Sequence, residues 1–386
     1  MLGCLVLSLS VATAAHAGKR ADGRSARAGS HRAAAPAGPP VDREAAERLR
    51  SELGHEFYVR HTPHFRIAYN TGIEFADFHG DLFEAVYRSF RDFFEKSGFA
   101  LEPPGGRLEV VLFDSREQFT RYAAARNPEA QRSGGFYSSR ENRIAFFDSL
   151  SDEHYRRTSQ KLESVEESIR ARRAEIGSLE RTASVTFTYA DGRSETYPKK
   201  RALAVVAEQQ RDLREERRRI RAFYEDRNLS TTIHECVHQL AYNLGVQSLR
   251  ADNPKLLGEG LATYFETMGY TDLGPTGNRN PTRFKAYRAA REAGRLYGLE
   301  QLLTRDDLFD VNGSAAETAY AQSWALVQYL FDEHAEAFLD YLRAAARPRS
   351  SDTSAERWRV RLFSRSFGED LPGFEKKWRA YMRRFD

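Results

Sequence analysis

The alternation of apolar and polar residues predicts a sheet-forming region between Phe57 and Asp148. Runs rich in aromatic and β-branched residues favour strands, and a run with apolar residues at helical spacing extends up to Gly98, a plausible helix terminator. The predicted strands are 57–69 (one or two strands), 107–113, 134–139 and 142–148, and the predicted helices are 74–98 and 115–126. This order predicts an α+β fold whose mixed sheet lies in residues 41–150.

A seven-residue apolar repeat starts after Tyr155 and indicates two long helices. Its steps of seven, three and four residues are typical of a coiled-coil seam. The apolar positions are Leu162, Val165, Ile169, Ile176 and Leu179, and then Leu203, Val206, Leu213, Ile220 and Tyr224. Between the two runs, Asp191-Gly192 is a hairpin signal. We therefore expect residues 151–226 to form an inserted antiparallel coiled-coil arm with a β-hairpin tip. Two roles are open for this arm: control of what reaches the cleft, or docking of a protein partner through its charged faces.

The stretch "TTIHECVHQLAYN", residues 231–243, has an apolar stripe at helical spacing. Ser230 and Thr231 are residue types that cap a helix start, and Gly245 is one that ends a helix. Cys236 falls near the apolar stripe and is expected in the core. The sequence therefore predicts a helix here, within a helical C-terminal subdomain that spans 227–386.

Two histidines on this helix form a candidate metal site. His234 and His238 are four residues apart, so they lie roughly 40° apart around a helix and can offer ring nitrogens to one ion. Glu235 projects beside them and can accept a proton from metal-bound water, which is the logic of the H-E-x-x-H pattern. The alternative is that two histidines share a helix flank without binding a metal.

A hydrolytic zinc site needs a third protein ligand and one open position. The next stretch with suitable residues is "LLGEGLATYFETM", residues 256–268, in which Glu259 and Glu266 share the face opposite the apolar residues. Small residues between them would allow two helices to approach closely around an ion. For either glutamate, an ordinary solvated carboxylate is the alternative.

The pattern "HECVH" followed, after twenty residues, by "GEGLATYFE" resembles the gluzincin group of zinc metallopeptidases, the peptidase MA-like class. The resemblance implies a zincin-like catalytic domain that binds zinc through His234, His238 and Glu259, with Glu235 as the general base. Gly258 stands where the group often has asparagine. The stretch "AYAQSWALVQYL" is similar to the helix whose tyrosine steadies the oxyanion, which implies that role for Tyr320.

The resemblance covers about 57–148 and 227–386 and is nearest to an uncharacterised branch of exported bacterial proteins. It implies hydrolysis of a peptide or protein substrate. There are two alternatives. The first is a gluzincin fold kept as a catalytically weak or inactive binding module of the cell envelope, and the second is a scaffold protein joined through the arm. For Tyr320 the alternative is a core aromatic residue packed on Trp324 and Val327. We further expect Glu266 to orient a ligand histidine and an extended substrate to pair with 142–148 as an edge strand.

The N-terminus indicates export. Residues 1–17 are an apolar run that ends in Ala15-His16-Ala17, the pattern of a signal peptide. Residues 18–40 contain no aromatic or large aliphatic residue, which predicts a disordered linker. Removal of the signal peptide leaves Cys236 as the only cysteine, so no intramolecular disulfide is expected. A periplasmic, cell-envelope or extracellular location follows.

Net charge and hydropathy argue against two other classes of partner. The 59 basic and 55 acidic residues give a net charge of only +4, whereas nucleic-acid-binding domains concentrate positive charge. After the N-terminal run, no stretch resembles a transmembrane helix. We therefore expect neither nucleic-acid binding nor a stable membrane span.

Overall fold

The computed structural model describes residues 8–10, 43–189, 191–266, 280–310, 313–349, 353–368 and 370–386. The predicted linker 18–40, most of the predicted signal peptide 1–17 and Met268 lie outside the described residues. The chain divides into two compact units. The larger consists of Gly38–Ser151 with Asp226–Asp386, and the smaller contains Asp152–Glu225, close to the predicted limits 151–226.

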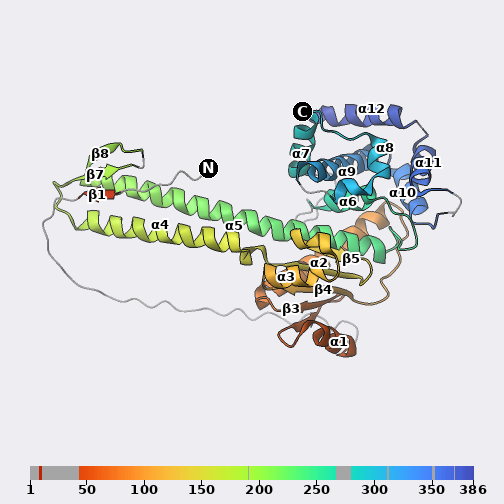
Figure 1. Cartoon of the computed structure of the whole chain (residues 1–386), viewed down its shortest axis with the longest axis horizontal. Helices are drawn as coiled ribbons and strands as arrows, with labels where there is room; N and C mark the ends of the chain where they lie inside the picture. Colours follow the sequence, from red (N-terminus) through yellow and green to blue (C-terminus); the bar gives the residue numbers. More distant parts are fainter. Residues whose placement is uncertain are drawn as a thin grey trace. The chain divides into compact units, whose positions relative to one another are not determined.

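A five-stranded mixed sheet organises the larger unit, in the order β2-β3-β4-β6-β5 (Figure 1). Its strands are β2 (Tyr58–His61), β3 (Phe65–Tyr69), β4 (Leu108–Phe113), β5 (Gly135–Ser138) and β6 (Arg143–Phe147). The inner pairs β3/β4 and β4/β6 are parallel, whereas β2/β3 and β5/β6 are antiparallel. The predicted α+β class and the hairpin made by the last two strands are confirmed.

The prediction that 142–148 is an edge strand is wrong. β6 lies between β4 and β5, because the turn at Asn142 folds β5 back along the outer side of β6. An extended substrate therefore cannot pair with β6. The edge on this side of the sheet is β5, Gly135–Ser138.

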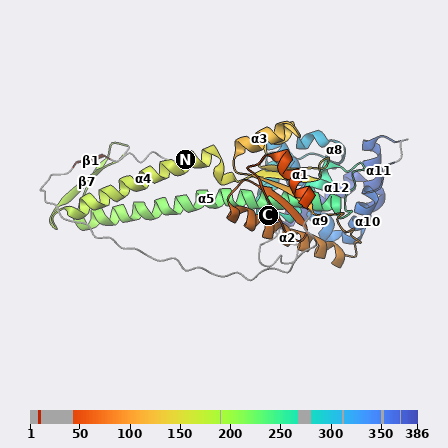
Figure 2. The same ribbon diagram turned by 90° about the horizontal axis from the view of Figure 1, so that it is seen from below.

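Helices cover both faces of the sheet, on opposite sides in Figure 2. Ile144 and Phe146 face α2 and the second half of α5, whereas Ala145 and Phe147 face α1 and α3, as the alternation of a strand requires. The helices concerned are α1 (Arg43–Leu53), α2 (Ile73–Lys96), α3 (Arg116–Ala124) and α5 (Lys199–Asn243). Cys236 is buried in the first of these cores, as predicted.

Helix α5 does not start at Ser230 or Thr231, so the predicted N-cap is wrong. It runs without a break from Lys199 to Asn243, because no glycine or proline interrupts this stretch. The predicted end is confirmed: Gly245 has φ +83°, the left-handed conformation that commonly follows a helix.

The rest of the larger unit is helical. Its α-helices are α6 (Lys255–Phe265), α7 (Pro281–Glu292), α8 (Leu299–Thr304), α9 (Ser314–Glu333), α10 (Ala335–Ala345), α11 (Ala355–Phe367) and α12 (Leu371–Met382). Short 3-10 helices occur at Pro128–Arg132, Ser149–Ser151, Asp306–Phe309 and Arg383–Phe385. Helices α6 and α9 pack closely at Gly260, where a β-carbon would lie 2.6 Å from Cγ2 of Val327 and 2.9 Å from the carbonyl oxygen of Ser323.

The smaller unit is an antiparallel pair of helices with a β-hairpin. The rings of Tyr155 and Tyr224 lie 4.9 Å apart, and Arg173 donates a hydrogen bond of 2.7 Å to Gln210, so the first helix runs against the second. Val165 is 40% exposed and does not belong to the seam, contrary to prediction. The elements are α4 (Glu153–Ser178), β7 (Ser184–Thr188), β8 (Ser194–Pro198) and the first part of α5.

Gly192 turns the hairpin with φ +84°, as the Asp-Gly signal predicts. The strand β1 (Ser8–Ser10) pairs antiparallel with β7, although it lies within the residues predicted as a signal peptide. Among the helices of the described ranges, none has both the length and the apolar character that crossing a bilayer requires.

Candidate metal centre

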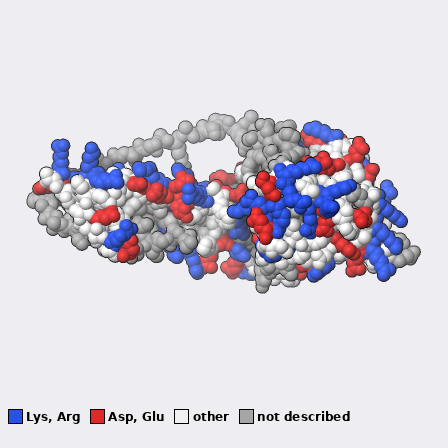
Figure 3. Space-filling view, turned by 90° about the horizontal axis from the view of Figure 1, so that it is seen from above, with Lys and Arg blue, Asp and Glu red and all other residues white. Residues whose placement is uncertain are grey.

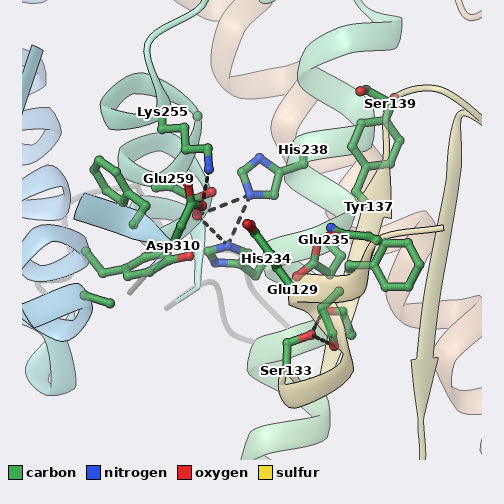
Figure 4. Close-up of a pocket in the computed structure, with 18 of the residues that line it drawn as sticks. Glu129, Ser133, Tyr137, Ser139, His234, Glu235, His238, Lys255, Glu259 and Asp310 are labelled. Atoms are coloured by element: carbon green, nitrogen blue, oxygen red, sulfur yellow. Dashed lines mark hydrogen bonds and ion pairs between the residues drawn. The ribbon is translucent and has the colours of Figure 1, made fainter. Parts of the chain in front are cut away.

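Three donor atoms from two helices converge in the larger unit. The distance between the Nε2 atoms of His234 and His238 is 3.1 Å. Oε2 of Glu259 lies 3.0 Å from Nε2 of His234 and 3.4 Å from Nε2 of His238. Figure 4 shows the three side chains pointing toward one another, the histidines from α5 and Glu259 from α6. The structure therefore brings together all three residues that the sequence predicts as ligands.

The donor triangle fits a tetrahedral zinc ion. With zinc–ligand bonds of about 2.0–2.1 Å, two donors of a tetrahedral site lie about 3.3 Å apart. The three observed separations, between 3.0 and 3.4 Å, match this value. Two neutral imidazoles and one carboxylate are also a donor set found in catalytic zinc sites. All three residues line one cavity, so a water or substrate oxygen can reach them.

Packing of α5 on the sheet fixes the histidines. Ile233 and Val237 are buried on the side of the helix that faces the core. On the same helix, the amide of the fully buried Gln239 donates to the carbonyl oxygens of Glu109 in β4 and Asn142 before β6, at 3.1 and 2.9 Å. These hydrogen bonds tie the helix to the sheet backbone.

Carboxylate and imidazole stabilise each other's charge at this centre. Burial opposes protonation of His234, but its hydrogen bonds to Glu259 and Glu266 outweigh burial and raise the pKa of His234 to about 10. Burial likewise opposes ionisation of Glu259, but His238 and His234 hold the pKa of Glu259 well below its ordinary value. Glu259 is therefore ionised, and its carboxylate oxygen can serve as a ligand when a cation takes the place of the His234 proton.

Glu266 lies behind His234, as expected for a carboxylate that orients a ligand. Its Oε1 is 2.9 Å from Nδ1 of His234, so it can accept the Nδ1 proton and leave Nε2 with a lone pair. Two residues that the sequence analysis missed hold Glu266: Arg283 contacts both of its oxygens, and Asn280 donates to Oε2 at 3.0 Å. The Asn280-Pro281 pair, a typical helix start, was the only local signal for this region.

Glu235 lines the cavity but lies outside the donor triangle. It receives a hydrogen bond from the backbone of Tyr137 in the edge strand β5. Burial raises the pKa of Glu235 above its ordinary value, and the nearby histidines only partly offset this effect. A half-buried carboxylate of raised pKa beside a metal site is suited to accept a proton.

Tyr320 lies at the cavity and not in the core. Its ring centre is 6.2 Å from that of His234 and 5.5 Å from that of Phe309, and it is partly exposed, whereas Trp324 and Val327 are buried. The charge of Glu259, followed by burial, raises the pKa of Tyr320 well above its ordinary value. The phenol therefore keeps its proton and can donate a hydrogen bond.

The cavity has a volume of about 520 Å³. The edge strand forms one wall with Gly135, Phe136 and Tyr137, and Lys255 at the start of α6 forms an ion pair with Asp310 on another wall. The edge strand, the candidate base and the donor triangle thus share one space.

The comparisons with known proteins cover this part of the chain. A family model described as a protein of unknown function, DUF1570, matches residues 228–351. No curated protein matches the chain. The match takes in the C-terminal third of α5 together with α6 and α9. The region that is similar to this family therefore contains His234, Glu235, His238, Glu259 and Tyr320.

Proposed function

We propose that this chain is a zinc-dependent metallopeptidase of gluzincin type that hydrolyses peptide bonds. The observation that carries the proposal is the donor triangle of His234, His238 and Glu259, with the half-buried carboxylate of Glu235 beside it in the same cavity. A site that only bound a structural zinc would have no chemical need for this carboxylate.

Each residue has a definite task in this proposal. A zinc ion at the site would polarise the substrate carbonyl and lower the pKa of a bound water. Glu235 accepts a proton from the attacking water and passes it to the leaving amide nitrogen. The hydroxyl of Tyr320 donates a hydrogen bond to the carbonyl oxygen as negative charge develops there. Glu266 keeps His234 in the required orientation.

The edge strand β5 is the place where we expect an extended substrate. Main-chain hydrogen bonds along an edge strand hold a peptide with little dependence on its sequence. β5 fits this role because it lines the cavity and contacts Glu235 through the backbone of Tyr137.

Export and partner binding complete the proposal. We propose that residues 1–17 direct the chain out of the cytoplasm and that the smaller unit docks a protein partner. On the face seen in Figure 3, Lys and Arg lie beside Asp and Glu, which gives no single basic area for nucleic acid.

Substitution of Glu235 tests the proposed chemistry. Glu235→Gln should retain zinc, because Glu235 lies outside the donor triangle, while hydrolysis of peptide mixtures followed by mass spectrometry should fall at least about 100-fold. Glu129→Gln removes a carboxylate from the same cavity and should stay within about tenfold of the parent. Equal activity of Glu235→Gln and the parent would refute the general-base role.

A further inference from the structure

Arg283 belongs to a third helix, α7, and lies where it can control the orientation of the metal ligand His234. It belongs to the first turn of α7, and its side chain is only 22% exposed. Its Nε is 3.0 Å from Oε2 of Glu266, and its Nη2 is 2.7 Å from Oε1. Both carboxylate oxygens are therefore held by one planar guanidinium, the geometry that arginine forms with carboxylates and lysine cannot.

The same carboxylate oxygen links Arg283 to the metal site. Oε1 of Glu266 receives Nη2 of Arg283 and also lies 2.9 Å from Nδ1 of His234. Asn280 donates to the other oxygen, Oε2, at 3.0 Å and so supports the orientation that Arg283 imposes on both oxygens. The plane of the carboxylate, and with it the direction of the His234 ring, is thus set from α7.

The guanidinium is restrained from a second side. Its central carbon lies 5.6 Å from the centre of the Tyr320 ring, within the range of a cation–π contact. Arg283 therefore sits between a carboxylate and an aromatic ring, and its own freedom is small.

We propose that Arg283 is a positioning residue that sets the zinc affinity of the site through Glu266 and His234. This inference rests on the proposed function only in that it requires zinc to bind at His234, His238 and Glu259. Partners behind a ligand histidine change metal affinity by about 10–100-fold when they are removed. Loss of Arg283 removes its two hydrogen bonds and leaves Glu266 held by Asn280 at Oε2 alone, so that Oε1 no longer fixes the His234 ring and Nε2 no longer points steadily at the donor triangle.

The test measures the zinc dissociation constant of full-length variants with a chromophoric competitor. Arg283→Met should weaken zinc binding about 10–100-fold, and Arg283→Lys, which keeps the charge but loses the planar pair of hydrogen bonds, should also weaken it. Arg143→Met is the matched control. Arg143 is a buried arginine whose guanidinium donates to the carboxylates of Glu52 and Glu109 and lies 3.7 Å from that of Glu141. It projects from the face of the sheet opposite α5 and should leave the zinc affinity unchanged.

A double substitution tests whether Arg283 acts through Glu266. If it does, adding Arg283→Met to Glu266→Ala should change the dissociation constant by less than about twofold. A zinc dissociation constant equal to that of the parent protein in Arg283→Met or Arg283→Lys would overturn the inference and leave the proposed function intact. Additive effects of the two substitutions in the double variant would overturn the route through Glu266. Failure of the parent protein to bind zinc would instead overturn the proposed function.

Discussion

At the scale of the residue, His234 has a separate partner at each ring nitrogen. Nδ1 faces Glu266, and Nε2 faces His238 and Glu259. The spacing of the two histidines on one helix was sufficient to predict their pairing, because four residues make about one turn. Arg283 gave no such signal, since it belongs to a separate helix and lies seventeen residues beyond Glu266 in the sequence.

A buried histidine outside the site predicts a loss of stability in acid. His79 is 1% exposed, its Nδ1 donates to the carbonyl oxygen of Phe75, and burial lowers the pKa of His79 to about 4. The unfolded chain, with an ordinary histidine pKa near 6.5, then binds the proton more tightly than the folded protein. The stability that neutral His79 contributes is therefore complete above about pH 6.5 and is lost as the pH falls toward 4.

The size of this effect can be measured by denaturant unfolding at several pH values. The difference between the pKa of His79 in the folded and in the unfolded chain corresponds to about 3 kcal/mol at most in the free energy of unfolding. His79→Leu should flatten the decline between pH 6.5 and pH 4 by an amount of this order. An unchanged pH profile in His79→Leu would show that His79 does not titrate in this way.

At the scale of the element, the site depends on how closely α6 and α9 pack. α6 carries Glu259 and α9 carries Tyr320, and the contact at Gly260 leaves no room for a side chain. Small residues near Glu259 predict a close approach of two helices. The partner helix cannot be predicted in this way, because the spacing of residues within one helix says nothing about its neighbours.

Substitution of Gly260 tests this packing. Gly260→Ala should destabilise the protein by about 1–3 kcal/mol and weaken zinc binding, because the backbone of Ser323 cannot yield as a flexible side chain would. Thermal unfolding and zinc titration measure the two effects. Gly177→Ala is the control: this helical glycine has open space around it, so the change should be neutral or slightly stabilising. Unaltered stability and zinc affinity in Gly260→Ala would contradict the packing argument.

Strand order shows where prediction from the sequence stops. The strands, the helix from Ile73 and the hairpin of β5 with β6 were all predictable from local patterns. The position of each strand in the sheet was not predictable in this way. The residues of β6 were expected at an edge, although their apolar run also suits an interior strand. Which strand lies outermost is decided by tertiary pairing, and here β5 covers β6.

At the scale of the whole molecule, the metal site and the helical hairpin belong to different units. The donor triangle, Glu235 and the cavity lining all come from the larger unit. Helix α5 nevertheless contributes residues to both units, up to Glu225 in the smaller and from Asp226 in the larger. The sequence predicted the hairpin from its heptads, but placed a helix start where α5 is continuous.

Removal of the hairpin tests this division. Replacing residues 155–222 with a short Gly/Ser linker should leave zinc binding intact, because no donor is lost and the rest of α5 keeps its buried face. Zinc content and circular dichroism of the truncated protein provide the measurement. Deletion of the hairpin tip alone, 180–198, is the milder control. If the tip deletion folds and binds zinc but the truncated protein does neither, the segment belongs to the catalytic unit.

The central claim is that His234, His238 and Glu259 bind one zinc ion, and elemental analysis of the purified protein tests it most directly. The account predicts about one zinc per chain in the parent protein and loss of that zinc in His234→Ala and in His238→Ala, with Glu235→Gln retaining it. A parent protein without zinc, or a His234→Ala variant that keeps its zinc, would contradict the account.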